Sequence, residues 1–387
     1  MTFPLKGIKV LELARVLAGP WAGQVLADLG AEVIKVESPE GDETRGWGPP
    51  FVEGIEGSSL DSAYFHSCNR GKKSIVIDFK SKEQLEIIYK LAKQTDIVIE
   101  NFKVDGLKKY NLDYQSLSKL NSKIIYCSIT GFGQDGPYAK KPGYDFIIQA
   151  LSGIMDLTGE KDKEPQKMGV AFSDIFTGLY SVIAIQSALK VREETGKGQH
   201  LDMSLMDSMT AVLANQALNY FVSGHAPSRL GNKHPNIVPY QTFPTKDGFL
   251  VIAVGNNQQF ERLCKALDIN QSSFLEKFNS NQKRVAQREK VVKVISDKTK
   301  SFSKQSLKSI LEEHSVPVGV VNKLNEVFQD PQVIKRKLKI ETPSPDAKKG
   351  FTPGLRTPIL FSNSKLDLSK GVPRLGEHTK EIIESLK

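Results

Sequence analysis

The sequence has few of the residues from which disulfide frameworks and metal sites are built. Its 387 residues include three cysteines, Cys68, Cys127 and Cys264, and six histidines. Because the cysteines are odd in number and far apart, their spacing fits neither a disulfide framework nor a zinc site. No His-Glu-x-x-His and no Gly-x-Ser-x-Gly motif occurs, which removes the simplest zinc-hydrolase and serine-hydrolase interpretations. We expect reduced thiols and no bound metal.

Long apolar runs and recognisable targeting segments are also missing. No stretch of about 18 apolar residues occurs, which argues against a membrane span. The N-terminus enters a strand pattern directly, so we expect a cytoplasmic protein. The net charge of +9 comes mainly from lysines spread along the chain, and such a surface attracts phosphorylated molecules. Because no nucleic-acid-binding module is recognisable, we expect neither nucleic acid nor a membrane as a partner.

The chain does contain a repeated alternation of strand and helix patterns. Helical segments at residues 21–29 and 82–94 lie between short β-type runs, which we place at residues 8–14, 31–37, 74–79, 96–100 and 123–130. This alternation predicts an α/β fold with a doubly wound parallel sheet. Ligands of such sheets bind outside the carboxyl ends of the strands. The loops that matter are therefore residues 15–19, 78–80, 101–103 and 131–137.

The length of the chain predicts about two domains. The composition changes near Ser223, where a loop at residues 224–235 precedes a hairpin around Lys246-Asp247-Gly248. Lysine-rich amphipathic helices follow through about residue 313. We predict a large α/β domain at residues 1–222, a smaller α+β domain at residues 223–315, and a C-terminal segment at residues 316–387 that returns to the large domain.

Two glycine motifs resemble phosphate-binding loops but lack their context. Gly131-Phe-Gly133-Gln-Asp-Gly136 fits the dinucleotide fingerprint, yet Pro137 and Pro142 interrupt the helix that should follow. This argues against nicotinamide or flavin binding. The segment Gly71-Lys-Lys-Ser74 fails as a P-loop, because His66 occupies the position where a glycine is required.

Asp174 is the carboxylate to which the sequence draws attention. It follows an apolar run and opens a long apolar segment, residues 175–189, whose length suits a buried helix. At a helix N-terminus the unpaired N–H groups and the helix dipole favour the ionised carboxylate, which is then available as an acceptor or a nucleophile. Asp is also a preferred N-cap residue, so the pattern alone leaves a purely structural role open.

Motifs spread from one end of the chain to the other carry a family resemblance. They are Leu17-Ala-Gly-Pro20, Ala31-Glu-Val-Ile-Lys-Val-Glu37, Gly41-Asp with Arg45-Gly-Trp47, Asn69-Arg-Gly-Lys-Lys-Ser74, Glu100-Asn-Phe102, Gly131-Phe-Gly-Gln-Asp-Gly-Pro137, Gly143-Tyr-Asp145, Ser173-Asp174 with Thr177-Gly178, and Leu375-Gly-Glu-His-Thr379. With them the chain resembles the class III CoA-transferases of the CaiB/BaiF type. The resemblance implies a Rossmann-like large domain, an interlocked homodimer, and Asp174 in the position of the family's nucleophilic aspartate.

The chemistry explains why that position should hold an aspartate. Its attack on an acyl-CoA gives a mixed anhydride, and the released thiolate can then form an aspartyl-CoA thioester. This thioester keeps the free energy needed for transfer to another carboxylic acid. The implied substrates are an acyl-CoA and a carboxylic acid, with no metal, nicotinamide or flavin. Backbone N–H groups near the helix start and in the loop at residues 131–136 are candidate oxyanion donors.

The resemblance also implies where CoA binds. The matching positions of the formyl-CoA branch are Leu17, Ala18, Ile77, Asp78, Phe79, Lys80, Asn101, Phe102, Lys103 and Lys109, with Tyr144 near the thioester. Lysines suit phosphates as point charges. Ser38 stands where the formyl branch has an arginine, and that branch's glycine-run lid has no counterpart between residues 223 and 259. Formyl and oxalyl specificity is therefore not implied.

Tyr144 distinguishes transfer from racemisation within the family. The racemase branch has a histidine at this position, whereas a phenol is a poor base at neutral pH. CoA transfer is favoured, and the alternatives are an α-methylacyl-CoA racemase-type epimerase and a non-catalytic CoA-binding protein.

Residues 234–241 and 255–260 look most like the succinyl-CoA:glutarate (hydroxymethylglutarate) branch, which implies succinyl-CoA as donor and a dicarboxylate acceptor. A cation should hold the acceptor's distal carboxylate, and the candidates are Arg15, Arg45, Arg229 and His234. Each of them also fits an ordinary ion-paired loop residue.

Overall fold

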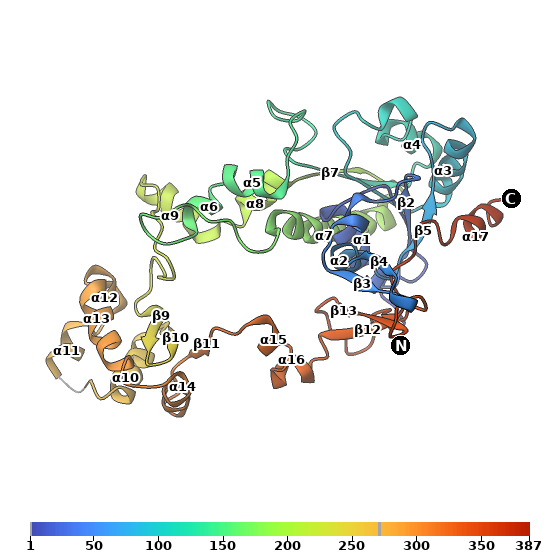
Figure 1. Cartoon of the computed structure of the whole chain (residues 1–387). Coiled ribbons are helices and arrows are strands. Elements are labelled where there is room, and N and C mark those ends of the chain that lie inside the picture. Colours follow the sequence, from blue (N-terminus) through green and yellow to red (C-terminus); the bar gives the residue numbers. More distant parts are fainter. Residues whose placement is uncertain (1, 270–271) are drawn as a thin grey trace. The chain divides into compact units, whose positions relative to one another are not determined.

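The computed structural model describes residues 2–269 and 272–387, which form two compact units (Figure 1). The first unit contains the chain up to Ile154 together with Lys167–Ser223 and Pro331–Lys387. The second contains Met155–Gln166 and Gly224–Asp330. The chain therefore enters the second unit twice, briefly after Ile154 and again after Ser223, and returns to the first unit each time.

The first unit is organised around a six-stranded sheet in which every pair of neighbouring strands is parallel. The strand order is β5 (Lys73–Val76), β2 (Glu32–Glu37), β1 (Lys9–Glu12), β6 (Ile97–Glu100), β7 (Ile125–Thr130) and β8 (His200–Ser204). This is the strand order of a Rossmann sheet, whose topological switch point lies between β1 and β6. The parallel sheet predicted from the sequence is confirmed.

Helices cover both faces of this sheet, as Figure 1 shows. The helices α1 (Ala18–Asp28) and α7 (Phe172–Thr195) share a core with Val10 and Ile97, whereas α3 (Lys82–Gln94) and α4 (Tyr114–Leu120) share a core with Leu11 and Val98. Successive strand residues point to opposite faces, which explains why adjacent residues enter different cores.

The contact between α1 and α7 positions the centre of the first unit. A Cβ atom on Gly178 would lie 2.8 Å from the Ala18 carbonyl oxygen and 3.1 Å from Trp21 Cδ1, so the two helices can approach this closely only at a glycine. Within the described ranges 2–269 and 272–387, α7 is the one helix long and apolar enough to cross a membrane by length and composition. Its buried side chains Val182, Ile185 and Leu189 belong to the core beneath the sheet.

Short elements connect the main layers of the first unit. They are η1 (Glu43–Gly46), β3 (Phe51–Glu53), η2 (Ile55–Gly57), β4 (Ser59–Ser62), α2 (Ala63–Cys68), η3 (Lys108–Tyr110), α5 (Asp145–Leu151), α8 (Leu205–Ala211) and α9 (Ala214–Ser223), and α6 (Ile154–Leu157) begins where the chain first passes into the second unit. The sequence predicts one helix from the end of β8 to about residue 221. The structure divides it into α8 and α9, and Ala214 has a positive φ of 47° at the break.

The second unit contains a three-stranded antiparallel sheet of order β11-β10-β9, formed by β9 (Tyr240–Thr245), β10 (Gly248–Ala253) and β11 (Val318–Val320). Its helices are α10 (Asn257–Ala266), α11 (Ser272–Lys277), α12 (Asn281–Ala286), α13 (Arg288–Thr299), α14 (Lys304–Glu313) and α15 (Leu324–Val327). Phe243, Leu250 and Phe260 are buried together in its core. The hairpin predicted around Lys246-Asp247-Gly248 is present.

The returning segment adds α16 (Pro331–Lys335), the pair β12 (Lys339–Pro343) and β13 (Phe351–Leu355), and α17 (Thr379–Glu384). Just before α17 it covers the outer edge of β5. The Gly376 N–H donates to Ser74 Oγ at 2.9 Å, the Ser74 N–H donates to His378 Nδ1 at 3.2 Å, and the Val76 N–H donates to Thr379 Oγ1 at 3.1 Å. The motif Leu375-Gly-Glu-His-Thr379 thus protects a sheet edge that would otherwise be unpaired.

Candidate active site

Asp174 lies where the beginnings of two helices meet. It is the third residue of α7 and lies one turn before Gly178, where α7 contacts Ala18, the first residue of α1. The N–H of Ala18 is directed to the carboxyl group closely enough to lower its pKa by hydrogen bonding. Both helix dipoles are positive at this end, so each favours the ionised carboxylate. The prediction that Asp174 lies at a helix N-terminus is confirmed.

Burial shifts the pKa of Asp174 in the opposite direction to these dipoles. Loss of water around the carboxyl group raises the pKa of Asp174 to about 7, and the charge of Asp145 also raises it, whereas the Ala18 N–H lowers it. The sequence alone suggested an ionised group, but burial outweighs the hydrogen bond. At neutral pH Asp174 therefore exchanges between its protonated form and a carboxylate that is more basic than an exposed one.

Asp145 holds the residue before Asp174 in place. Its Oδ1 accepts hydrogen bonds from the Ser173 N–H at 3.0 Å and from the Ser173 hydroxyl at 2.5 Å, and its Oδ2 accepts one from Gln149 Nε2 at 2.8 Å. Tyr144 precedes α5 and is 66% exposed. Hydrogen bonds between Asp145 and Ser173, 28 residues apart, thus join the Gly143-Tyr-Asp145 and Ser173-Asp174 motifs.

Tyr64 is electrostatically coupled to Asp174, which the sequence did not reveal. Burial raises its pKa, and the charge of Asp174 is the next cause, so its hydroxyl stays protonated at neutral pH and is close enough to sense Asp174. Trp47 packs against it, with ring centroids 5.2 Å apart at an interplanar angle of 68°. The Arg45-Gly-Trp47 motif indicated that this region matters, but nothing in the sequence indicated that Trp47 packs against Tyr64.

The turns that were expected to bind CoA lie together. Phe79 follows β5 and Phe102 follows β6, and their rings stack with centroids 6.2 Å apart. Tyr110 packs against Phe79 at 5.4 Å and carries Lys109 Nζ 4.7 Å above its ring. Ile77, Leu17 and Ala18 are buried, whereas Lys80, Lys103 and Lys109 are exposed. Phe79, Phe102 and Tyr110 therefore form an aromatic cluster, and the turns that carry it also carry the exposed Lys80, Lys103 and Lys109.

The four cations considered for a distal carboxylate differ in their surroundings. The guanidinium of Arg45 is 9% exposed, bonds Glu37 and Asp61, and lies 3.9 Å from the centre of the Phe65 ring. Its donors are thus committed to the protein. By contrast, Arg15 is 53% exposed and has a single ion pair, with Glu43 at 2.9 Å.

The other two candidates belong to the second unit. Arg229 forms an ion pair with Asp156 at 2.7 Å. The Nδ1 atom of His234 accepts a hydrogen bond from the Asn236 N–H at 3.1 Å. Burial, followed by the charge of Arg288, lowers the pKa of His234, which reduces its cationic form at neutral pH.

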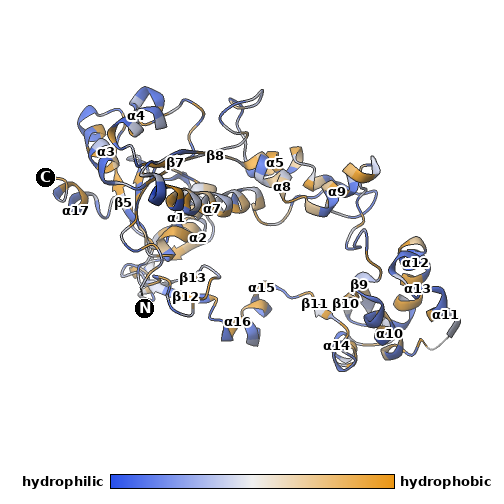
Figure 2. Ribbon diagram, turned by 180° about the vertical axis from the view of Figure 1, so that it is seen from behind, coloured by the Kyte–Doolittle hydropathy of each residue, from blue (hydrophilic) through white to orange (hydrophobic). Residues whose placement is uncertain are grey.

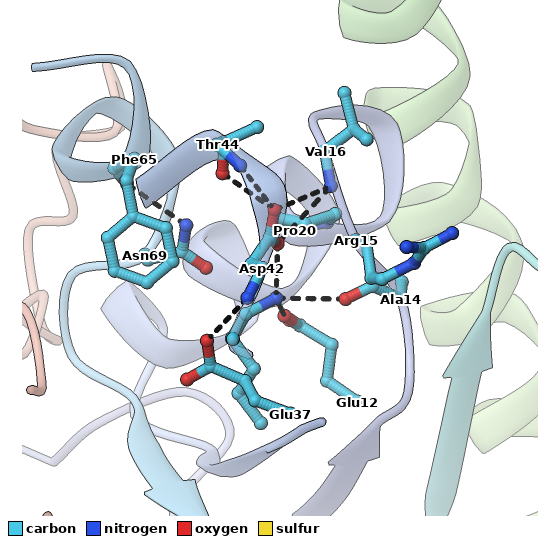
Figure 3. Close-up of polar contacts among 12 residues, drawn as sticks. Glu12, Ala14, Arg15, Val16, Pro20, Glu37, Asp42, Thr44, Phe65 and Asn69 are labelled. Atoms are coloured by element: carbon cyan, nitrogen blue, oxygen red, sulfur yellow. Dashed lines mark hydrogen bonds and ion pairs between the residues drawn. The ribbon is translucent and has the colours of Figure 1, made fainter. Parts of the chain in front are cut away.

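The loop between β1 and α1 carries backbone strain. Val16 has a φ of +69°, a conformation that is unusual for a β-branched residue and costs on the order of 1 to 3 kcal/mol. Its N–H donates to both oxygens of Asp42, at 3.4 and 3.3 Å (Figure 3). Lys35 supports this contact from below, because its Nζ lies 3.0 Å from Asp42 and donates to the Ala14 carbonyl at 2.9 Å.

The glycine loop after β7 uses its backbone donors internally. The Gly133 N–H donates to Thr130 Oγ1 at 3.0 Å, and the Gln134 N–H donates to Asp202 Oδ2 at 2.9 Å. Gly131 allows a close backbone contact, since a Cβ there would lie 2.5 Å from the Gly143 Cα. The backbone donor found at Asp174 comes from α1, at Ala18, instead of from this loop.

Known proteins resemble this chain over its whole length. A family model described as "CoA-transferase family III" matches residues 5–379. A protein of Agrobacterium fabrum named succinate–glutarate CoA-transferase is 54% identical over 385 residues, which cover 99% of this chain and 96% of that protein. Human succinyl-CoA:glutarate CoA-transferase is 40% identical over 384 residues, with coverage of 99% and 86%. The crystal structure of a CAIB/BAIF family protein from Brucella suis matches with a TM-score of 0.89 and 55% identity and covers 100% of both chains.

The charge of Asp145 should be measurable at Asp174. Asp145→Asn is expected to lower the pKa of Asp174, because a neighbouring negative charge disappears while an acceptor for Ser173 remains. A ¹³C NMR titration of the aspartate carboxyl carbons, assigned with Asp174→Ala, measures this. Asp202→Asn is the matched control, because the charge of Asp202 acts on Glu100. An identical titration of Asp174 in wild type and Asp145→Asn would contradict the account.

Proposed function

This chain belongs to CoA-transferase family III, and from that premise we propose that it moves CoA from succinyl-CoA to a dicarboxylic acid through an aspartyl-CoA thioester at Asp174. The observation that carries the proposal is the half-buried Asp174, whose carboxyl group is largely desolvated and receives an N–H donor from a second helix. The names of the Agrobacterium fabrum and human relatives support the two acids.

The proposed reaction has two matched halves. The ionised carboxylate of Asp174 attacks the thioester carbonyl, the carbon–sulfur bond breaks, and a mixed anhydride and the CoA thiolate form. The thiolate then attacks the Asp174 carbonyl, which releases succinate and leaves aspartyl-CoA. The acceptor carboxylate repeats these steps in reverse and leaves as its CoA thioester. No water enters the balance, so the free energy of the thioester is conserved.

Two donors near Asp174 suit the charges that develop. The Ala18 N–H points at the carboxyl group that becomes an oxyanion when the thiolate attacks, and loss of such a donor costs about 3 to 4 kcal/mol in activation free energy. Tyr64 keeps its proton at neutral pH, so it can donate a hydrogen bond but cannot act as a base. CoA is proposed to lie along residues 77–80, 101–103 and Lys109, with Leu17, Ala18 and Tyr144 near the thioester end.

Asp174→Ala is expected to abolish transfer while the protein still binds CoA, because the surface at residues 77–80 and 101–103 is unchanged. Acyl-CoA products from succinyl-CoA and a panel of dicarboxylates are measured by mass spectrometry. During turnover, borohydride or hydroxylamine should mark the side chain of Asp174 in the wild-type protein. Undiminished transfer by Asp174→Ala would exclude this nucleophile, and α-proton exchange without transfer would favour the epimerase.

The distal carboxylate of the acceptor is proposed to bind Arg15, the exposed guanidinium on the loop that leads to Ala18. Arg15→Ala should raise the acceptor KM at least about tenfold, the effect expected when a charge-assisted hydrogen bond is lost, and leave the donor KM nearly unchanged. Steady-state kinetics with both substrates varied test this. Arg229→Ala and His234→Ala are the comparison variants, and an acceptor effect confined to them would move the assignment to the second unit.

A homodimer is also proposed, because the first unit exposes a broad apolar surface on α5, α7 and α9, the helices whose apolar residues are orange in Figure 2. The exposed side chains include Phe146, Ile147, Leu151, Leu179, Tyr180, Ile183, Leu218, Phe221 and Val222. The exposed fractions reach 71% for Phe221 and 85% for Val222, and monomers seldom leave such patches in water.

Sedimentation equilibrium is expected to give twice the chain mass of 42.9 kDa at every dilution, because the proposed dimer is interlocked. Mixed isotope-labelled and unlabelled dimers should exchange subunits only after unfolding. A folded species with the mass of one chain would contradict the assembly.

A further inference from the structure

The side chain of Asn101 bridges the two strands at the switch point of the sheet. The last backbone hydrogen bond between the segments that continue β1 and β6 runs from the Leu13 N–H to the Ile99 carbonyl, at 2.8 Å. Two residues further on, the Arg15 N–H donates to Asn101 Oδ1 at 2.8 Å, and Asn101 Nδ2 donates to the Arg15 carbonyl at 2.7 Å. A side-chain amide here replaces the peptide groups of a neighbouring strand and extends the β1–β6 pairing to Arg15.

Asn101 is itself held firmly. The carboxylate of Glu100 accepts the Phe102 N–H at 2.8 Å and so closes a tight turn around Asn101. Glu100 is 6% exposed and ends β6, a strand in which every residue is buried. The turn therefore presents the Asn101 amide from a rigid support, which is what positioning another segment requires.

The segment after Arg15 needs such support. Val16 is held at a φ of +69°, and its N–H reaches Asp42 through hydrogen bonds of 3.3 and 3.4 Å, which are long for this type of contact (Figure 3). The Arg15 clamp is shorter on both sides. Ala18 begins α1 two residues beyond Val16, and its N–H is the one donated to Asp174. The direction of that N–H thus depends on the strained turn.

We infer that Asn101 is a positioning residue for Asp174: its amide clamps Arg15 and thereby holds the Val16 turn so that the Ala18 N–H meets the Asp174 carboxylate. The inference rests on the proposed function for its kinetic consequence, but its structural consequence exists in the free protein. The clamp is separate from the CoA contact proposed for residues 101–103, because its two hydrogen bonds join the Asn101 amide to the Arg15 backbone. Asn101→Ala removes the clamp and keeps the backbone of residue 101 and the side chains of Phe102 and Lys103.

Asn101→Ala should release the turn with little change in substrate affinity. A misplaced donor at a reacting group costs roughly 100-fold in kcat, so we expect a loss of about that size with the acyl-CoA KM within about threefold of wild type. The pKa of Asp174 should rise, because its ionised form loses the Ala18 hydrogen bond, and the acidic limb of the pH–kcat/KM profile should move to higher pH. Lys103→Ala, on the same turn, should instead raise the acyl-CoA KM.

A second substitution separates clamping from any direct contact with CoA. Glycine adopts positive φ without strain, so a turn with Val16→Gly needs the clamp less. The double variant Asn101→Ala/Val16→Gly should recover at least about tenfold of the kcat lost in Asn101→Ala. Absence of recovery, or a defect of Asn101→Ala confined to the acyl-CoA KM, would overturn the inference.

Amide hydrogen exchange in the substrate-free protein tests the clamp without any turnover. Asn101→Ala should accelerate exchange at residues 15–18 by at least about tenfold, while the core strand β6 keeps its protection, which also verifies folding. Unchanged exchange at these amides would refute the clamp even if transfer by the wild-type protein were confirmed. Conversely, accelerated exchange in a protein that shows no Asp174-dependent transfer would refute the proposed function and leave the clamp standing.

Discussion

The partial desolvation of one carboxyl group, that of the half-buried Asp174, is the constraint on which the candidate site depends. Removing a carboxylate from water is costly unless donors and dipoles replace its hydration. The structure supplies these from two helix starts, one of them the helix that contains Asp174 and the other α1. The two helices meet because position 178 lacks a side chain. The balance leaves the pKa of Asp174 at about 7, close to the pH at which a carboxylate can be both available and reactive.

The parallel sheet explains why the supporting residues come from distant parts of the sequence. In sheets of this type, the segments that follow the two strands at the switch point run in different directions, and ligands usually bind in the crevice between them. At the end of β1 there is an ionic network in which Lys35 and Lys72 share the carboxylate of Glu12, and all three side chains are fully buried. Such networks are weak evidence for stability, but their fixed geometry suits a loop that must keep one strained conformation.

The sequence predicted the parallel sheet and the position of Asp174 at the start of a helix, whereas the role of Asp174 stays a prediction. The bounds of α3 agree with the prediction because local signals set them: Ser81 caps the helix and its apolar residues lie on one face. The break before Ala214 was missed because no local signal marks it. The state of Arg45 was equally inaccessible, since Glu37 and Asp61 reach it only through tertiary contacts. Motif resemblance can identify a site residue, but it does not reveal which polar atoms are already occupied.

The covering of the β5 edge has a consequence for biosynthesis. Ser74 and the residue that accepts its N–H, His378, are 304 positions apart. While the ribosome makes the intervening chain, the central sheet has an open border that can recruit strands from other nascent chains. The fold therefore completes its protection only after the 304 intervening positions have been made.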